Sequence, residues 1–196
     1  MNSNRFSFLC RTKTCFGKNA LDHLPFELTG MGAQKPFVLH DSPSHEAGPV
    51  KQLIRAFQDS GMPLGIPAGF EPGTPLTKKA LKEYYQVYTD KGFDSIIAVG
   101  GDAVCNAAKL LNLSVSNGPE VLQHQDNSFR LTQPVNPLAV LPTVMGMGRA
   151  TDCTALIENS RYRHPELAPD IALATRKMVT GQKLTQVVDA VLACLA

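Results

Sequence analysis

The chain has 196 residues, room for one domain or slightly more, and its 43% hydrophobic and 18% charged residues are typical of a globular chain that buries a core. A formal net charge of +2, with no stripe of basic residues, argues against a dedicated nucleic-acid or membrane-surface binder, since both need a dense positive field. The sequence shows no apolar run near the roughly 20 residues of a membrane span, no signal peptide and no Cys-x-x-Cys pair, so we expect a cytoplasmic protein with free thiols.

The first half of the chain alternates predicted strands and helices. A buried strand is expected at residues 36–41, followed by an amphipathic helix from Val50 that ends at Gly61. Residues 62–66 predict only an edge strand, because Pro63 donates no hydrogen bond to a ladder. A loop rich in Pro and Gly then leads into a second helix, whose apolar face carries Leu81, Tyr84, Tyr85 and Tyr88.

The second half continues the alternation. Its clearest strand, 93–99, runs straight into Gly100-Gly101 and a helix. Residues 112–134 are polar and rich in turn-forming residues, so we predict an irregular segment there. A strand at 137–141 opens into a second glycine-containing loop, 142–148. Shorter strands are expected at 153–157 and 171–174, and a final helix is predicted by the apolar stripe of Leu184, Val187, Val188, Val191 and Leu195.

This alternation defines the expected fold class. Strands that are apolar throughout, without polar residues between, belong in parallel sheets that helices cover on both faces. We therefore predict an α/β fold, Rossmann-like and doubly wound, with a mostly parallel sheet. Ligands of such sheets bind beyond the carboxyl ends of the strands, where three loops are expected: Asp41-Ser42, Gly100 to Asp102, and Thr143 to Gly148.

Three motifs carry a resemblance to a known family. Residues 96–109 read Ile-Ile-Ala-Val-Gly-Gly-Asp-Ala-Val-Cys-Asn-Ala-Ala-Lys, residues 142–148 read Pro-Thr-Val-Met-Gly-Met-Gly, and residues 16–20 read Phe-Gly-Lys-Asn-Ala. From about residue 16 to 173 the chain resembles the N-terminal half of the iron-containing alcohol dehydrogenases, relatives of glycerol dehydrogenase and dehydroquinate synthase. The resemblance implies an NAD(P)-dependent oxidoreductase that transfers hydride between nicotinamide and an alcohol or aldehyde.

The resemblance also implies a dinucleotide site on these loops. Backbone N–H groups at Gly100 and Gly101, at the start of a helix, would hold the pyrophosphate, and Gly146 belongs to the second motif of the same site. Thr143 would donate its hydroxyl to a phosphate, and Asp41 would accept from the adenosine ribose, which favours NAD over NADP. The alternatives are a tight strand–helix turn without a ligand at Gly100-Gly101, and a helix cap or solvated turn residue at Asp41.

Three residues of the first motif bear on how well this site would bind. Asp102 stands where the family has a third glycine; it suits a helix N-cap, but its carboxylate would repel a pyrophosphate. Asn106 replaces a family Asp, which removes another polar contact. Weak binding of NAD, with NADP possible, is therefore expected. Lys109 matches the family pattern, and we expect its side chain to be solvated.

The metal site of the family is incomplete in this sequence. Family members hold iron or zinc with one Asp and three His from a C-terminal helical domain. In this sequence Asp189 matches the first of these ligands, but Ala193 stands where the family has the next ligand, a His. The five histidines all lie upstream, without metal-ligand spacing. We therefore expect neither iron nor zinc and assign no catalytic residue. The expected domains are a dinucleotide-binding domain, 1–180, and the first helix of a truncated helical metal-binding domain, 181–196.

Two functions remain open. The chain is either the cofactor-binding part of an alcohol dehydrogenase whose metal-binding half comes from elsewhere, or a non-catalytic nucleotide-binding or protein-interaction module of the same descent. The apolar stripe at 184–195 has no later chain to cover it, so we expect a homodimer or a complex with a separate helical-domain partner.

Overall fold

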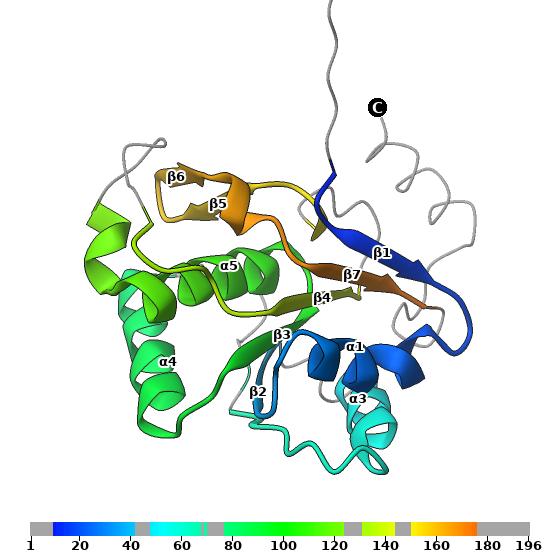
Figure 1. Ribbon diagram of the computed structural model, residues 1–196. Coiled ribbons are helices and arrows are strands. Elements are labelled where there is room, and N and C mark those ends of the chain that lie inside the picture. Colours follow the sequence, from blue (N-terminus) through cyan, green and yellow to red (C-terminus); the bar gives the residue numbers. More distant parts are fainter. Residues whose placement is uncertain are drawn as a thin grey trace, which may run out of the picture.

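A five-stranded parallel sheet forms the centre of the computed structural model, which describes residues 10–41, 48–67, 69, 77–123, 131–143 and 150–175. The strands are β1 (Lys13–Phe16), β2 (Pro36–His40), β3 (Ser95–Gly100), β4 (Leu138–Pro142) and β7 (Ile171–Ala174). They lie in the order β1-β7-β4-β3-β2, and every neighbouring pair is parallel (Figure 1).

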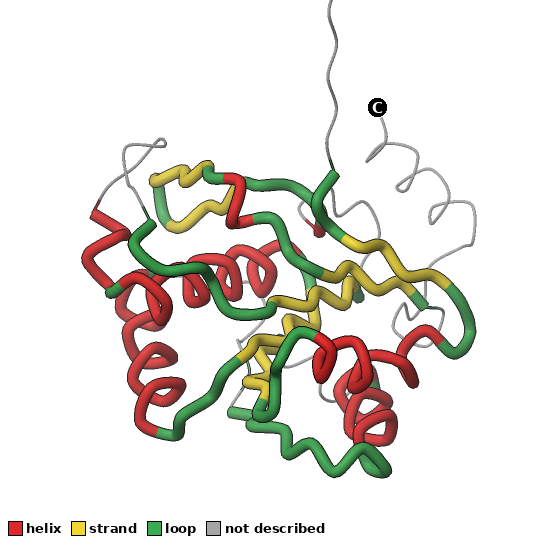
Figure 2. The backbone as a smooth tube through the Cα atoms, in the orientation of Figure 1, coloured by secondary structure: helices red, strands yellow, loops and turns green. Residues whose placement is uncertain are grey.

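Helices cover both faces of this sheet, as Figure 2 shows. One face packs against η1 (Ala20–His23), α1 (Leu24–Gly30) and α3 (Pro49–Phe57), and the other against α4 (Lys78–Asp90) and α5 (Asp102–Asn117). An antiparallel hairpin packs on α5 and consists of β5 (Thr154–Ile157) and β6 (Ser160–Arg163). The remaining short helices are η2 (Pro119–Gln123) and η4 (Pro165–Leu167).

Alternation along β2 divides its side chains between the two cores. Phe37 and Leu39 belong to the core under α4 and α5, whereas Val38 packs with α1 and α3. The rings of Phe37 and Tyr88 meet edge to face, with centroids 5.7 Å apart. Burial raises the pKa of the Tyr88 phenol, so the group stays neutral, and its oxygen accepts from Nδ2 of Asn136 at 3.0 Å.

The predicted fold class is confirmed. The strands expected at 36–41, 93–99, 137–141, 153–157 and 171–174 are all present, and the five-stranded sheet is parallel with helices on both faces. The expected edge strand at 62–66 is reduced to one parallel bridge between Gly65 and Phe37, on the outer side of β2.

The irregular segment predicted at residues 112–134 is wrong in its first part, because α5 continues to Asn117 and η2 follows it. The polar residues that indicate turns here are instead used by the helix to bind a neighbouring segment. Asn112 donates to the carbonyl of Asn136 at 2.7 Å, and Oδ1 of Asn117 accepts from the backbone N–H of Thr132 at 2.8 Å. The elements β1 and α1 were not predicted at all.

Some predictions fall outside the described residues. These include the final helix at 184–195 and the domain boundary at 180. Within the described ranges, no helix is both long enough and apolar enough to cross a membrane.

The chain leaves the adjacent strands β2 and β3 in opposite directions. After β2 it passes through α3 on one face and reaches Gly65 on the outer side of β2, whereas after β3 it passes through α5 on the opposite face and returns as β4. Such a reversal is the topological switch point of an open α/β sheet, the usual place for a ligand. The fold therefore indicates a site beyond His40 and Gly100.

Candidate functional site

The ends of β2, β3 and β4 meet at Gly100. A Cβ atom built on this glycine would lie 2.8 Å from Oδ2 of Asp41 and 2.7 Å from Cγ2 of Val104, closer than real Cβ contacts. Its carbonyl oxygen accepts the backbone N–H of Thr143 at 3.2 Å. The structure thus brings together predicted site residues from three loops, and position 100 requires glycine. We call Asp41, Gly100, Gly101, Asp102 and Thr143 the switch-point site.

Helix α5 begins within this site. Gly101 is its N-cap, and the carbonyl of Gly101 accepts the N–H of Cys105 at 3.1 Å. The first N–H groups of a helix have no acceptor within the helix, and together they carry a partial positive charge. The start of α5 therefore favours an anionic group, and the two preceding glycines carry no side chain that would obstruct its approach.

Asp102 occupies a different position from the one expected. It is the first residue of α5 and not the N-cap, since Gly101 caps the helix. Its exposed carboxylate lies in the first turn, where the helix dipole stabilises a negative charge. A phosphate at this helix end would therefore meet the charge of Asp102.

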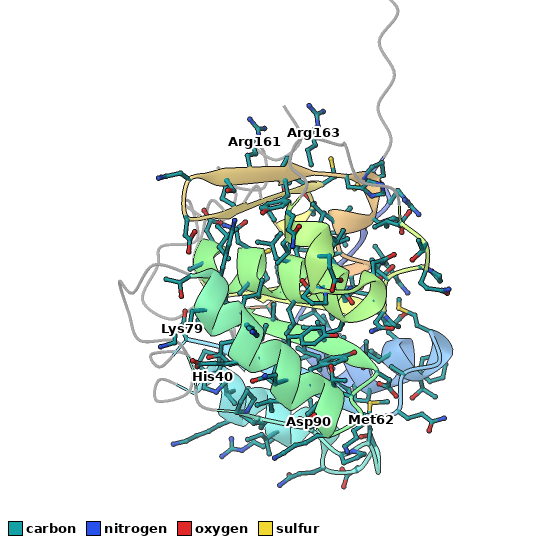
Figure 3. All side chains as sticks on the ribbon, turned by 90° about the vertical axis from the view of Figure 1, so that its left-hand side faces the viewer. His40, Met62, Lys79, Asp90, Arg161 and Arg163 are labelled. Carbon is teal, nitrogen blue, oxygen red and sulfur yellow. The ribbon has the colours of Figure 1, made fainter. Side chains whose placement is uncertain are left out.

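His40 also belongs to the site, although nothing in the sequence beyond its place before Asp41 indicates this. Its ring is 4% exposed; Nδ1 lies 3.1 Å from the carbonyl oxygen of Asp41, and Nε2 lies 3.0 Å from that of Pro67. Figure 3 shows His40 at the same edge of the molecule as Lys79, near the start of α4, and away from Asp90 at its end.

Lys109 is buried, so the expectation of a solvated side chain is wrong. Its Nζ donates to Oδ1 of Asp152 at 2.5 Å, to the Asp152 carbonyl at 2.8 Å and to the Thr154 carbonyl at 3.0 Å. These three bonds satisfy the three donors of the ammonium group. Lys109 therefore fastens α5 to the segment that leads into β5. Its signal in the sequence is a charge within the otherwise apolar stretch of α5.

The other residues named from the sequence divide into two groups. Cys105 and Asn106 are both buried in α5. Gly146 of the second motif and Asp189, the position of the family's first metal ligand, lie outside the described residues, so their roles stay predictions.

The described part of the chain does not fit the family's metal. No three or more His, Cys, Asp or Glu side chains within it gather where they could hold a metal ion. Iron and zinc sites in proteins use several such ligands.

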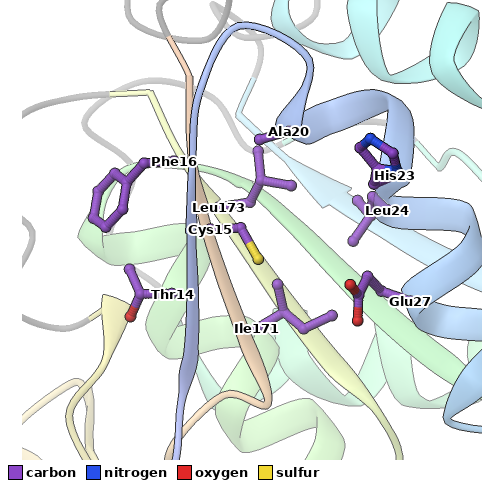
Figure 4. Close-up of a pocket in the computed structure, with 9 residues that line it drawn as sticks. All are labelled: Thr14, Cys15, Phe16, Ala20, His23, Leu24, Glu27, Ile171 and Leu173. Atoms are coloured by element: carbon purple, nitrogen blue, oxygen red, sulfur yellow. The ribbon is translucent and has the colours of Figure 1, made fainter.

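A separate groove of about 350 Å³ lies at the opposite edge of the sheet, where β1 and β7 face η1 and α1 (Figure 4). Cys15, His23 and Glu27 are among its lining residues, and Glu27 is paired with Lys13 at 2.6 Å. The groove is separate from the switch-point site, since β1 and β7 line the groove and the site lies at the ends of β2, β3 and β4.

The parallel sheet with helices on both faces and a switch point is a Rossmann-like α/β domain. The model of the family described as iron-containing alcohol dehydrogenase matches residues 11–175. The chain belongs to this family.

The relatives that match this chain are longer than it. The probable alcohol dehydrogenase EutG of Escherichia coli K12 is 31% identical over 159 residues, which cover 76% of this chain and 39% of the relative. The NAD-dependent methanol dehydrogenase of Bacillus methanolicus is 24% identical over 155 residues, covering 79% of this chain and 40% of the relative. The chain thus spans less than half the length of these relatives.

Solved structures show the same fold. NADH-dependent butanol dehydrogenase A of Thermotoga maritima superposes with a TM-score of 0.79 at 18% identity, covering 94% of this chain and 47% of that one. Sulfoacetaldehyde reductase of Bifidobacterium kashiwanohense, solved in complex with NAD+, gives a TM-score of 0.75 at 15% identity, covering 89% of this chain and 47% of that one.

Proposed function

We propose that the switch-point site binds NAD and that this chain supplies the cofactor-binding part of an alcohol dehydrogenase type of oxidoreductase. The observation that carries the proposal is the meeting of three strand ends at Gly100, where no side chain fits, directly before the start of α5. Family membership and the named relatives, which include NAD-dependent and NADH-dependent enzymes, support it.

Each residue of the site has a task in this proposal. The N–H groups of Gly101 and of the first turn of α5 bind the pyrophosphate, and the hydroxyl of Thr143 donates to a phosphate oxygen. Gly146 lets the second loop approach the same group. The bound dinucleotide supplies the nicotinamide that accepts or donates hydride, while this chain holds and orients it.

Asp41 decides between the two nicotinamide cofactors in this proposal. Its carboxylate lies beside Gly100, where it can accept from the hydroxyls of the adenosine ribose. The 2′-phosphate of NADP would bring a second negative group to the same carboxylate. NAD is therefore the preferred cofactor, and NADP binds more weakly.

Calorimetric titration with NADH tests the proposal, with Gly100→Ala as the disruptive variant. The added Cβ would strike Asp41 and Val104, so we expect a loss of at least tenfold in affinity. Gly30→Ala is the matched control, because a Cβ at the end of α1 meets nothing within 4 Å. Absence of NADH binding by the unaltered chain overturns the proposal, and so does equal binding by Gly100→Ala.

Oxidation of an alcohol, or reduction of an aldehyde, is the activity we propose for the complete catalytic unit. The described residues do not fit a metal, so its ligands must come from elsewhere, with Asp189 as the position that matches the family's first ligand. A separate helical-domain partner, or a part of the protein outside this sequence, would supply the rest, in the cytoplasm. Elemental analysis of the purified chain alone is expected to show no stoichiometric iron or zinc.

A non-catalytic nucleotide-binding or protein-interaction module is the second candidate. The lack of a metal-ligand cluster within the described residues favours it. Assay of NADH formation from a series of primary alcohols, with added Fe²⁺ or Zn²⁺, separates the two. Turnover that disappears in Gly100→Ala supports the oxidoreductase, whereas NADH binding without turnover supports the module.

A further inference from the structure

The contacts of His40 connect the end of β2 to the segment that borders it. One ring nitrogen faces the backbone carbonyl of Asp41, and the other faces that of Pro67, 27 residues away in the sequence. A Cβ on Gly69 would lie 2.5 Å from both Cε1 and Nδ1 of the ring, so the backbone at 69 packs directly on the imidazole. The ring is thus in contact with the backbone of Asp41, of Pro67 and of Gly69.

The chemistry of these contacts requires a donor from His40. Both partners are carbonyl oxygens, which only accept hydrogen bonds. A neutral imidazole donates to one of them, and a protonated imidazole donates to both. An apolar side chain in this place would donate to neither and would leave two partly buried carbonyl groups without these bonds.

The contacts of His40 lie at the end of β2, next to Asp41, and this position gives them a role in ligand recognition. Gly65, which precedes the bound segment, pairs with Phe37 on the side of β2 away from β3. His40 therefore joins the backbone of Asp41 to the segment on its outer side, while the carboxylate of Asp41 lies on its inner side, beside Gly100. Loss of the ring contacts would release the Asp41 carboxylate together with the backbone at Pro67 and Gly69.

We propose that His40 is a positioning residue that sets the preference of this site for a dinucleotide with a free ribose 2′-hydroxyl. The inference rests on the proposed binding of NAD. His40 holds Asp41 where its carboxylate accepts from that hydroxyl and opposes a 2′-phosphate. Without His40, the carboxylate moves away from the ribose, so NAD loses a hydrogen-bond acceptor and NADP loses an unfavourable neighbour.

Three substitutions separate the two contacts. His40→Asn keeps a donor near the place of Nδ1, His40→Gln keeps one near the place of Nε2, and His40→Leu keeps neither. His23→Leu is the control, since His23 is an exposed histidine on η1 beside the groove at the other edge of the sheet. Calorimetry then gives the affinities for NADH and NADPH in each variant.

We expect His40→Leu to weaken NADH binding by about tenfold and to leave NADPH binding unchanged or tighter, because NADH loses the ribose contact whereas NADPH loses an unfavourable neighbour. His40→Asn and His40→Gln should fall between this variant and the unaltered chain. A role in folding alone would weaken both cofactors equally, so an unchanged NADPH-to-NADH ratio in all three variants overturns the inference while leaving NAD binding intact. If His40→Leu does not fold, the ratios of the two amide variants decide.

Hydrogen exchange provides a readout without cofactor. The amide of Gly65 donates to the carbonyl of Pro36 at 2.9 Å, and that of Val38 donates to the carbonyl of Gly65 at 2.8 Å. Both amides should exchange faster in His40→Leu than in His23→Leu. Equal exchange in the two variants would show that His40 does not hold the bordering segment, and would overturn the inference even if NADH binds.

Discussion

At Gly100 the close approach of Asp41 and Val104 leaves no room for a side chain, and the next residue but one carries a negative charge. The glycine suits an anionic ligand, whereas Asp102 opposes it. The same helix end that attracts a phosphate also stabilises the Asp102 carboxylate, so the two compete. The affinity of the site is therefore set by the charge at residue 102 as much as by the glycines.

Asp102→Gly should strengthen NADH binding. At ~5 Å and an effective dielectric near 20, repulsion between the carboxylate and one phosphate charge is on the order of 3 kcal/mol, an upper limit of about a hundredfold in affinity. Asp102→Asn removes the charge without adding backbone freedom and should reproduce most of the gain. Calorimetry measures both, and no gain in either variant would mean that the carboxylate points away from the bound phosphates.

At the scale of secondary structure, periodicity predicted the strands well because each is apolar throughout and ends at a Gly or a polar turn. It predicted the helix after Gly100-Gly101 but not its continuation to Asn117, because α5 is buried from Val104 to Ser114 and no polar face marks where the helix ends. Its polar residues, Asn112 and Lys109 among them, bond to segments distant in the sequence. Such partners cannot be inferred from local patterns.

Local sequence patterns also predict only part of the candidate site. The sequence placed Asp41, Gly100 and Thr143 at the carboxyl ends of three strands, and the structure brings them together. The contacts of His40 with Pro67 and Gly69 depend on the path of the chain beyond β2, which the sequence does not reveal.

The bond between Lys109 and Asp152 should stabilise the fold. Lys109→Met removes the buried partner of the pair. Because Asp152 is partly exposed, water can hydrate its carboxylate in this variant, which limits the expected loss in the free energy of unfolding to about 2–3 kcal/mol. Asp152→Ala leaves a buried ammonium without its carboxylate and should cost at least as much. Urea denaturation gives both values, with Lys82→Met on the exposed side of α4 as the control. Losses no larger than that of the control would contradict this account of Lys109.

At the scale of the whole molecule, the chain spans less than half the length of its relatives, and the apolar stripe at 184–195 remains to be accounted for. Burial of several hundred Å² of apolar surface stabilises a complex by roughly 25 cal/mol per Å². This is enough to drive association even when part of the entropic cost of bringing two chains together is subtracted. We therefore predict that the stripe, if it is buried against another chain, supports a dimer or a complex.

Light scattering at micromolar concentration tests this expectation. We predict a mass above that of one chain, and a fall towards the monomer mass in Val188→Lys and in Val191→Lys. A monomer whose mass neither substitution changes would show that the stripe has no part in assembly.

The central claim is that a dinucleotide binds where β2, β3 and β4 end. Hydrogen exchange followed by mass spectrometry, with and without NADH, tests it directly on the unaltered chain. The account predicts slower exchange on NADH addition in peptides that cover residues 39–41 and 100–106. Protection confined to residues 13–30, around the groove at the opposite edge of the sheet, would contradict it, as would exchange that NADH leaves unchanged throughout.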